Sequence, residues 1–122
     1  MGKRDHRLRS PEDFRRALRT RPLVRSGPIA IYRIDLDDQC RIGFVLPKKL
    51  VRSAVQRNQI KRWSRAFFRD LLKKPVDLSV ATRSFGLVVR VMAPLQKQWS
   101  RTVLIAEVRQ PLAQAFLQVG SK

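Results

Sequence analysis

The stretch GFVLPKKLVRSAVQRNQIKRWSRAFFR, residues 43–69, contains two hydrophobic patterns separated by a short basic loop. Its beginning belongs to a run of β-branched and aromatic residues, which predicts a strand over 41–46 that Pro47 ends. From 53 to 72 the hydrophobic period is that of a helix, and apolar residues gather in an arc of about 80°. The apolar residues that we expect to pack on a sheet are Ile60, Trp63, Phe67 and Leu71.

A second arc of the same helix, about 140° wide, carries cations. Its residues are Arg57, Asn58, Lys61, Arg62, Arg65 and Arg69. No acidic residue occurs between Asp38 and Asp70. Successive cations stand four residues apart, and like charges at that spacing destabilise a helix slightly. Because an external anion would relieve this repulsion, the arc is the candidate binding surface.

Three interpretations compete for this arc. A merely solvated helix usually interleaves charges of both signs, and this helix does not. A DNA-recognition helix would follow another helix and a tight turn, whereas a strand and a Pro-Lys-Lys loop precede this one. The third interpretation is that the arc binds RNA.

The composition also favours a polyanionic partner. The 122 residues include 27 Lys and Arg against 9 Asp and Glu, a formal net charge of +18, and 43% are hydrophobic. Nucleic acid is the first candidate partner because phosphate neutralisation releases counterions, and an anionic membrane surface is the second. We expect a single domain over 1–122. The lone Cys40 fits a reducing, cytoplasmic location, and no segment approaches the roughly 18 apolar residues of a membrane span.

Helix signals occur near both ends of the chain. Ser10 and Pro11 predict the start of a helix whose apolar stripe includes Phe14, after a flexible basic arm over 1–9. A final helix is expected from about 102 to 119, which Pro111 kinks or splits in two.

The strand signals complete the predicted fold. Strands are expected over 23–25, 29–36, 76–83 and 86–94. We expect strands 29–36 and 41–46 to form an antiparallel hairpin around the Asp37-Asp38-Gln39 turn. The order of elements predicts an α+β fold, a small two-layer sandwich with helices packed on a central mixed sheet.

The sequence offers little catalytic equipment. His6, the only histidine, lies in the basic arm, where we expect it to be solvated. Cys40 is expected to be a small, partly buried hydrophobe, and Asp35, Asp37 and Asp38 are expected to serve the turn rather than a metal ion. We therefore expect the protein to hold neither a catalytic side chain nor a metal.

The order of motifs over 43–69 resembles the protein subunit of bacterial ribonuclease P. That family carries a Gly-Phe strand, a Lys-Lys or Lys-Arg loop, an Ala-Val pair and a helix opening Arg-Asn-x-x-Lys-Arg-x-x-Arg. The corresponding residues here are Gly43-Phe44, Lys48-Lys49, Ala54-Val55, and Arg57-Asn58 through Lys61-Arg62 to Arg65. Arg7-Leu8 and Asp13-Phe14 are similar to the opening of that family, so the resemblance covers about residues 6–72.

The resemblance implies a fold and an activity. The fold would be a sandwich similar to a ribosomal-protein domain, with a left-handed crossover. The chain would be the accessory protein of an endoribonuclease whose catalyst is RNA, and which removes the 5′ leader of precursor tRNA. Contacts to the catalytic RNA would come from Lys48, Lys49, Arg52, Arg57, Asn58, Lys61, Arg62, Arg65 and Arg69. Asn58 could instead cap the backbone locally.

The resemblance also implies a cleft between the sheet and the first helix for the single-stranded leader. Phe14 and Tyr32 match the family's cleft aromatics by position, although both could be core residues; Arg83 and Arg90 are further candidates. Mg²⁺ would be held mainly by the RNA, and we expect the free protein to be a monomer without a membrane partner. The alternative function is a ribosomal or other structural RNA-binding protein without a role in cleavage.

Overall fold

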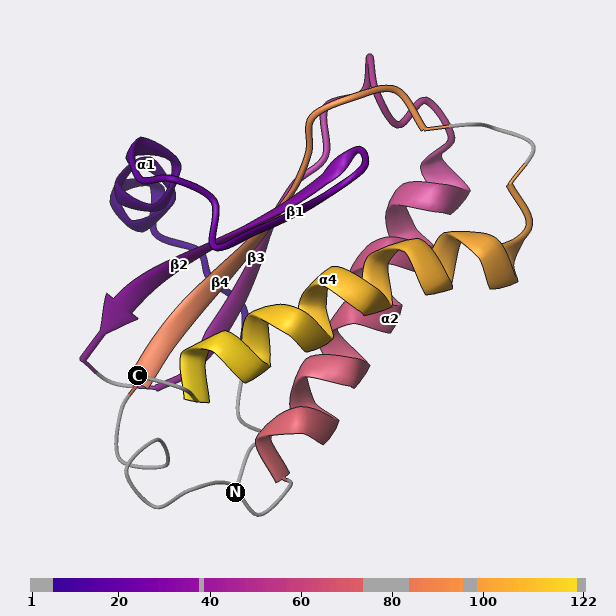
Figure 1. The fold of residues 1–122 in the computed structure, drawn as a ribbon. Coiled ribbons are helices and arrows are strands. Elements are labelled where there is room, and N and C mark those ends of the chain that lie inside the picture. Colours follow the sequence, from indigo (N-terminus) through magenta and orange to yellow (C-terminus); the bar gives the residue numbers. More distant parts are fainter. Residues whose placement is uncertain (1–5, 38, 74–83, 96–98, 121–122) are drawn as a thin grey trace, which may run out of the picture.

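A computed structural model describes residues 6–37, 39–73, 84–95 and 99–120 of the chain. The described residues form three helices and four strands (Figure 1). In chain order these are α1 (Pro11–Arg19), β1 (Val24–Ser26), β2 (Ile29–Leu36), β3 (Arg41–Val45), α2 (Ala54–Lys73), β4 (Ser84–Val91) and α4 (Arg101–Gly120). The predicted α+β class is confirmed. The strand predicted over 76–83 lies wholly outside the described residues.

The four strands form one mixed sheet in the order β1-β2-β4-β3. β4 pairs antiparallel with β2 and parallel with β3. The predicted hairpin between 29–36 and 41–46 is therefore wrong, because β4 lies between these strands. Residues 85–89 of β4 are all buried. A strand that is buried on both faces favours a central position in a sheet, with a neighbouring strand on each side.

The connection from β3 through α2 to β4 joins two parallel neighbours, as a crossover does. Its left-handedness stays a prediction from the resemblance. The short strand expected over 23–25 is present as β1, one residue further along. β1 turns into β2 at Gly27, whose φ of 57° suits a residue without a side chain.

Local signals set the beginning of each helix. The N–H of Asp13 donates to Ser10 Oγ at 3.4 Å, and the N–H of Gln56 donates to Ser53 Oγ at 3.2 Å. Both serines thus cap the free amides of a helix start. α4 is a single helix with Pro111 inside it, so of the two predicted alternatives the split is wrong and the kink stays a prediction. None of the described helices is both long and apolar enough to span a membrane.

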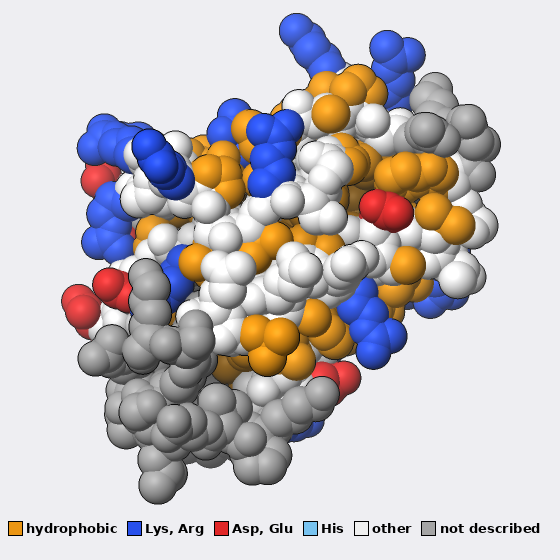
Figure 2. Space-filling model, viewed as in Figure 1, with side chains coloured by type: hydrophobic (Ala, Val, Ile, Leu, Met, Phe, Trp, Pro, Cys, Tyr) orange, Lys and Arg blue, Asp and Glu red, His pale blue; other side chains and the backbone are white. Residues whose placement is uncertain are grey.

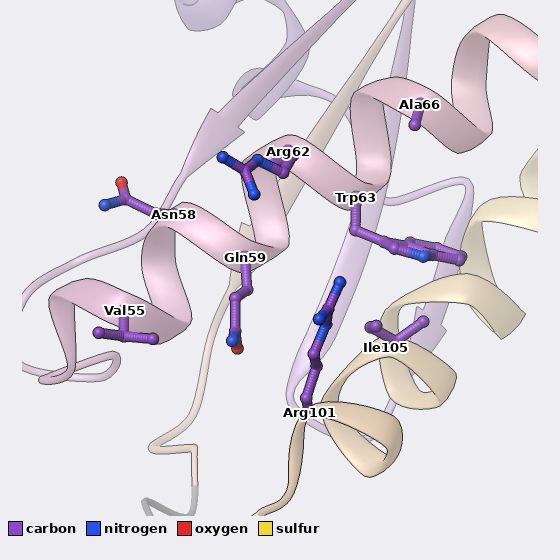
Figure 3. A pocket seen from close by; sticks show the side chains of 8 residues that line it. All are labelled: Val55, Asn58, Gln59, Arg62, Trp63, Ala66, Arg101 and Ile105. Carbon is purple, nitrogen blue, oxygen red and sulfur yellow. The ribbon is translucent and has the colours of Figure 1, made fainter.

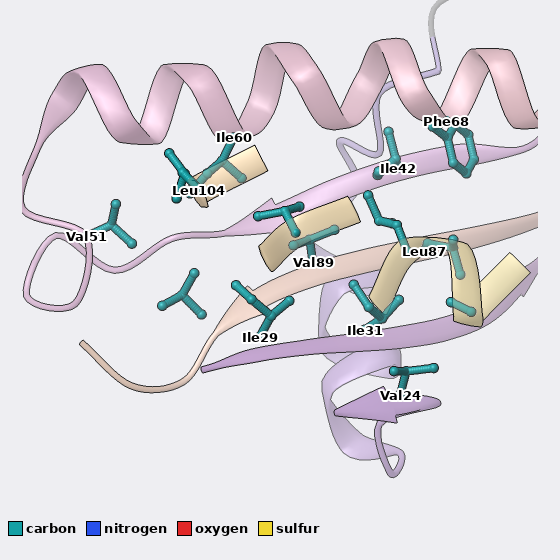
Figure 4. Packing of buried hydrophobic residues seen from close by; sticks show 14 of the residues in the cluster. Val24, Ile29, Ile31, Ile42, Val51, Ile60, Phe68, Leu87, Val89 and Leu104 are labelled. Carbon is teal, nitrogen blue, oxygen red and sulfur yellow. The ribbon is translucent and has the colours of Figure 1, made fainter. Parts of the chain in front are cut away.

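Two hydrophobic clusters lie on opposite faces of the sheet. α2 and α4 cover one face and α1 covers the other (Figure 1). The larger cluster, between the sheet and α2 and α4, includes Ile31, Ile42, Phe68, Leu87 and Leu104 (Figure 4). Buried residues of α4 stand both before and after Pro111. Their packing keeps the helix continuous at the proline. We call the other side the α1 face of the sheet.

The buried row of α2 differs in phase from the predicted one. The buried residues of the helix are Gln56, Ile60, Ser64 and Phe68. Trp63, which we predicted to be core, is only half-buried, as is Phe67. The buried row is thus centred about 40° from the predicted arc, and Phe68 rather than Phe67 points toward the sheet (Figure 4).

Residues 6–8, predicted as part of the flexible arm, lie beside β3. The Leu8 N–H donates to the Ile42 carbonyl at 2.9 Å, and the Ile42 N–H donates to the His6 carbonyl. Leu8 is buried against the α1 face. The N-terminal part of the predicted arm, residues 1–5, lies outside the described residues. The edge of β3 is therefore paired over this short distance, which protects it from other strands.

Replacing Gly43 with alanine is expected to lower the free energy of unfolding by about 1–3 kcal/mol. A Cβ atom there would lie 2.6 Å from Phe14 Cζ and 3.0 Å from Leu8 Cβ. The methyl group therefore has to displace the Phe14 ring from β3. Urea unfolding measures the cost, and a Phe14→Ala background should remove most of it because the ring is gone. Equal costs in both backgrounds would contradict the close approach.

Candidate nucleic-acid interface

The cationic face of α2, which we define as Arg57, Asn58, Lys61, Arg62, Arg65 and Arg69, lies on the solvent side of the helix. Asn58, Arg62 and Arg69 are exposed, whereas Arg57, Lys61 and Arg65 are half-buried. The buried row described above borders this face on the side of Arg57 and Lys61, which explains why these two are half-buried. The structure thus gathers the predicted cations on one surface. Whether they bind RNA stays a prediction.

Arg57 joins this face to the loop before the helix. Its Nη1 donates to the Val51 carbonyl at 2.7 Å and to the Arg52 carbonyl at 3.3 Å. Val51 is fully buried, so these bonds hold the loop at a fixed point. Arg57 therefore has a structural role beside any role in binding.

Arg65 lies against the neighbouring strand. Its guanidinium carbon stands 5.6 Å from the centre of the Phe44 ring in β3, within the range of a cation–π contact. Asn58 lies within α2, and Ser53 makes the N-terminal cap. Asn58 is therefore not the N-cap of α2, and whether it binds RNA or bonds to the local backbone stays a prediction.

The loop before α2 adds cations to the same end of the molecule. Lys48, Lys49 and Arg52 are exposed. Cationic side chains project at the top of Figure 2, where the connection between β3 and α2 lies in Figure 1. The first turn of α2 contains no acidic residue. The positive end of the helix dipole and the cations of the loop therefore both attract an anion to this end of α2.

The acidic side chains with assigned ion pairs are on other elements. Glu12 and Asp13 pair with Arg15 and Arg16 within α1, at 3.1 and 3.8 Å. Asp35 pairs with Arg33 within β2 at 3.0 Å. These carboxylates are thus directed toward arginines of α1 and β2.

The residues predicted for a leader cleft lie on the α1 face of the sheet. The register sets Tyr32, Val88 and Gly43 side by side across three strands, with the Phe14 ring over Gly43. Tyr32 is only 3% exposed, so its ring belongs to the core of this face. Its hydroxyl lies 3.4 Å from Nη1 of the half-buried Arg90, which donates to it. Arg83 lies outside the described residues.

The groups considered for catalysis are engaged in packing. His6 is half-buried: Nδ1 lies 3.0 Å from the Cys40 carbonyl, and the ring meets Phe68 edge-on at 6.1 Å. The expectation of a solvated histidine is wrong, because residues 6–8 dock on β3. Burial raises the pKa of the Cys40 thiol above its usual value, so the thiol stays protonated at neutral pH. Among the described residues, no cluster of His, Cys, Asp or Glu could hold a metal ion.

A groove of about 520 Å³ between α2 and the start of α4 was not predicted from the sequence. Its lining residues are Val55, Asn58, Gln59, Arg62, Trp63, Ala66, Arg101 and Ile105 (Figure 3). Asn58 and Arg62 belong also to the cationic face. The hydrophobic pattern of the helix assigned Trp63 to the core, so its place in a surface groove was not predicted. Arg101 lies near Trp63 only because α4 packs on α2.

Comparisons with known proteins agree with the fold. The family model described as Ribonuclease P matches residues 2–115. The ribonuclease P protein component of Nitrosomonas europaea is 32% identical over 108 residues, which cover 78% of this chain and 91% of that protein. The component of Ralstonia pickettii is 34% identical, over 90% of this chain and 76% of that one. The RNase P protein of Staphylococcus aureus has a similar fold, with a TM-score of 0.64, 23% identity, and coverage of 92% and 96%.

Proposed function

The chain belongs to the ribonuclease P protein family, and from this premise we propose that it binds the catalytic RNA of ribonuclease P through α2 and the preceding loop. In this proposal the RNA performs the cleavage that removes the 5′ leader of precursor tRNA. The protein supplies binding and alignment. The observation that carries the proposal is the cationic face of α2, whose charges stand on one side of a single helix.

The chemistry of this face suits folded RNA. Arginine forks can donate two hydrogen bonds to one phosphate, and neutralisation of several phosphates releases counterions. Arg57 and Arg65 are held by Val51 and Phe44, so their guanidinium groups are already ordered before RNA arrives. Lys61, Arg62 and Arg69 would then add contacts along the helix.

We propose further that the 5′ leader lies on the α1 face of the sheet. Phe14 is half-buried and offers part of its ring to an unpaired base, which favours stacking. Arg90 would contact the leader phosphates. The Tyr32 hydroxyl would position Arg90, because the two groups are within hydrogen-bonding distance. Tyr32 thus supports this surface from below and does not itself stack on bases.

Mg²⁺ in this proposal is held by phosphates of the RNA. The described carboxylates are either spread apart or paired with arginine, as Asp35 is with Arg33. The protein would raise the effective affinity for metal by aligning the substrate, and it would not ligate the ion.

Reconstitution at low Mg²⁺ tests the proposed function. Adding the chain to ribonuclease P RNA is expected to increase the rate of leader cleavage from precursor tRNA, because the protein's cations replace part of the ionic screening. A ribosomal protein of similar size and charge serves as the control. If that protein restores cleavage as well as this chain does, the chain acts only as a general RNA-binding cation, and the alternative function is favoured.

A further inference from the structure

The groove between α2 and α4 has the chemistry of a site for one nucleotide. Trp63 and Ile105 give it an apolar wall, and Arg62 and Arg101 bring a cation from each helix (Figure 3). Gln59 adds an amide that can donate and accept hydrogen bonds. None of the eight described residues that line the groove is acidic. The groove thus offers apolar surface and positive charge to the same small ligand.

Trp63 forms a prepared platform in this groove. Its indole stacks on the Phe67 ring, with 5.2 Å between ring centres and an angle of 19° between the planes. Phe67 does not line the groove, whereas Trp63 does, so the stacked Phe67 ring supports the indole from outside the groove. Stacking on an aromatic side chain is the main way in which proteins hold unpaired bases, and it tolerates any base.

Arg101 supplies charge from the other side. It is the exposed first residue of α4 and extends toward Trp63 (Figure 3). Ser100 caps the helix by accepting from the Val103 N–H at 3.3 Å, and the first turn of α4 contains no acidic residue. The guanidinium and the positive end of the helix therefore both favour a phosphate at this end of the groove.

The groove continues the cationic face of α2, with which it shares Asn58 and Arg62. Val55 stands at the edge of the groove and is 64% exposed. An RNA strand that lies along the cationic face passes this edge. A base turned out of that strand can enter the groove while its phosphates remain near the cations.

We propose that this groove holds one unpaired nucleotide of the RNA bound to α2, with the base against Trp63 and the phosphate at Arg101. The inference rests on the proposed function, since it takes the RNA on the cationic face as its source. It adds a base-binding subsite on α2 and α4, away from the α1 face where the leader is proposed to lie.

Tryptophan fluorescence tests the proposal directly. Trp99→Phe leaves Trp63 as the only tryptophan of the chain. Titration of this protein with single-stranded oligoadenylate of about six nucleotides is expected to quench Trp63 emission, whereas an abasic oligonucleotide of equal length should bind with little quenching. Arg101→Ala should weaken binding about tenfold, the order expected for a charge-assisted contact. The matched control is Arg25→Ala, an equal loss of charge from β1 at the far edge of the sheet.

Three results would overturn the proposal. The first is unchanged Trp63 emission when anisotropy of a labelled oligoadenylate shows that the protein is saturated. The second is equal weakening by Arg101→Ala and Arg25→Ala. The third is concentration-dependent burial of Trp63 without RNA, which would assign the groove to a second copy of the chain. Assembly of the same proteins with ribonuclease P RNA is measured in parallel: assembly without quenching rejects only the groove, and no assembly by any of them rejects the proposed function.

Discussion

Replacing Phe68 with alanine is expected to lower the free energy of unfolding by about 3–5 kcal/mol. The side chain is fully buried at the point where α2, β4, α4 and the N-terminal segment meet. Its ring meets the rings of Phe85 and Phe116 edge-on, at 6.2 and 5.6 Å, and also meets His6. Truncation leaves a cavity and removes three aromatic contacts, each worth about 0.5–1.5 kcal/mol beyond the buried area.

Phe67→Ala is the matched control for this prediction. The same atoms are removed from the next residue, but Phe67 is half-buried between Trp63 and Arg109, so the expected loss is about 1–2 kcal/mol. Urea unfolding of both variants gives the comparison. A larger loss for Phe67 than for Phe68 would mean that the helix packs in the phase first predicted from the sequence, and the structure of this interface would be wrong.

The sequence predicted those elements whose signals are local. Residues 29–36 were predicted as a strand from their alternation and their β-branched isoleucines, and β2 has these bounds. Ser10 with Pro11, and Ser53 before the long helix, mark helix starts because each cap bond is made within three residues. The cationic face was predictable for the same reason, since its members follow one another along a single helix.

Pairing between distant segments was not predictable in this way. The Asp37-Asp38-Gln39 turn favours a hairpin locally, but β4 has the longest buried run and takes the central place between β2 and β3. The buried face of α2 could not be predicted, because Phe67 and Phe68 are equally apolar neighbours. Only packing against Phe85 and Phe116 decides which of the two is buried. The groove at Trp63 could not be predicted because Arg101, one of its lining residues, comes from another helix.

A variant with Lys61, Arg62 and Arg69 all replaced by alanine is expected to bind ribonuclease P RNA about a hundredfold more weakly at roughly 0.15 M salt. The slope of log affinity against log salt should fall by about 2–3, since each lost phosphate contact removes about 0.7–0.9. Within the described part of the chain these three side chains have no hydrogen bond, ion pair or ring contact, whereas Arg57 donates to two carbonyls and Arg65 lies over the Phe44 ring. Their loss therefore reports on binding and not on the anchoring of the loop or of β3.

The free protein of this variant is expected to be slightly more stable than the parent. RNA affinity should therefore fall while the free energy of unfolding rises, which separates a loss of binding from a loss of folding. Removing Lys61 and Arg69 abolishes four like-charge pairs four residues apart, including the pair of Arg69 with Lys73. Each pair is unfavourable by about 0.2–0.5 kcal/mol, and alanine is the better helix former. A control variant with Arg19, Arg21 and Arg25 replaced by alanine loses the same charge from exposed positions at the end of α1, in the loop after it and on β1. Binding and urea unfolding are measured for both. Equal loss of affinity in the two variants would mean that RNA responds to the net charge of +18 alone, and the cationic face would lose its assignment.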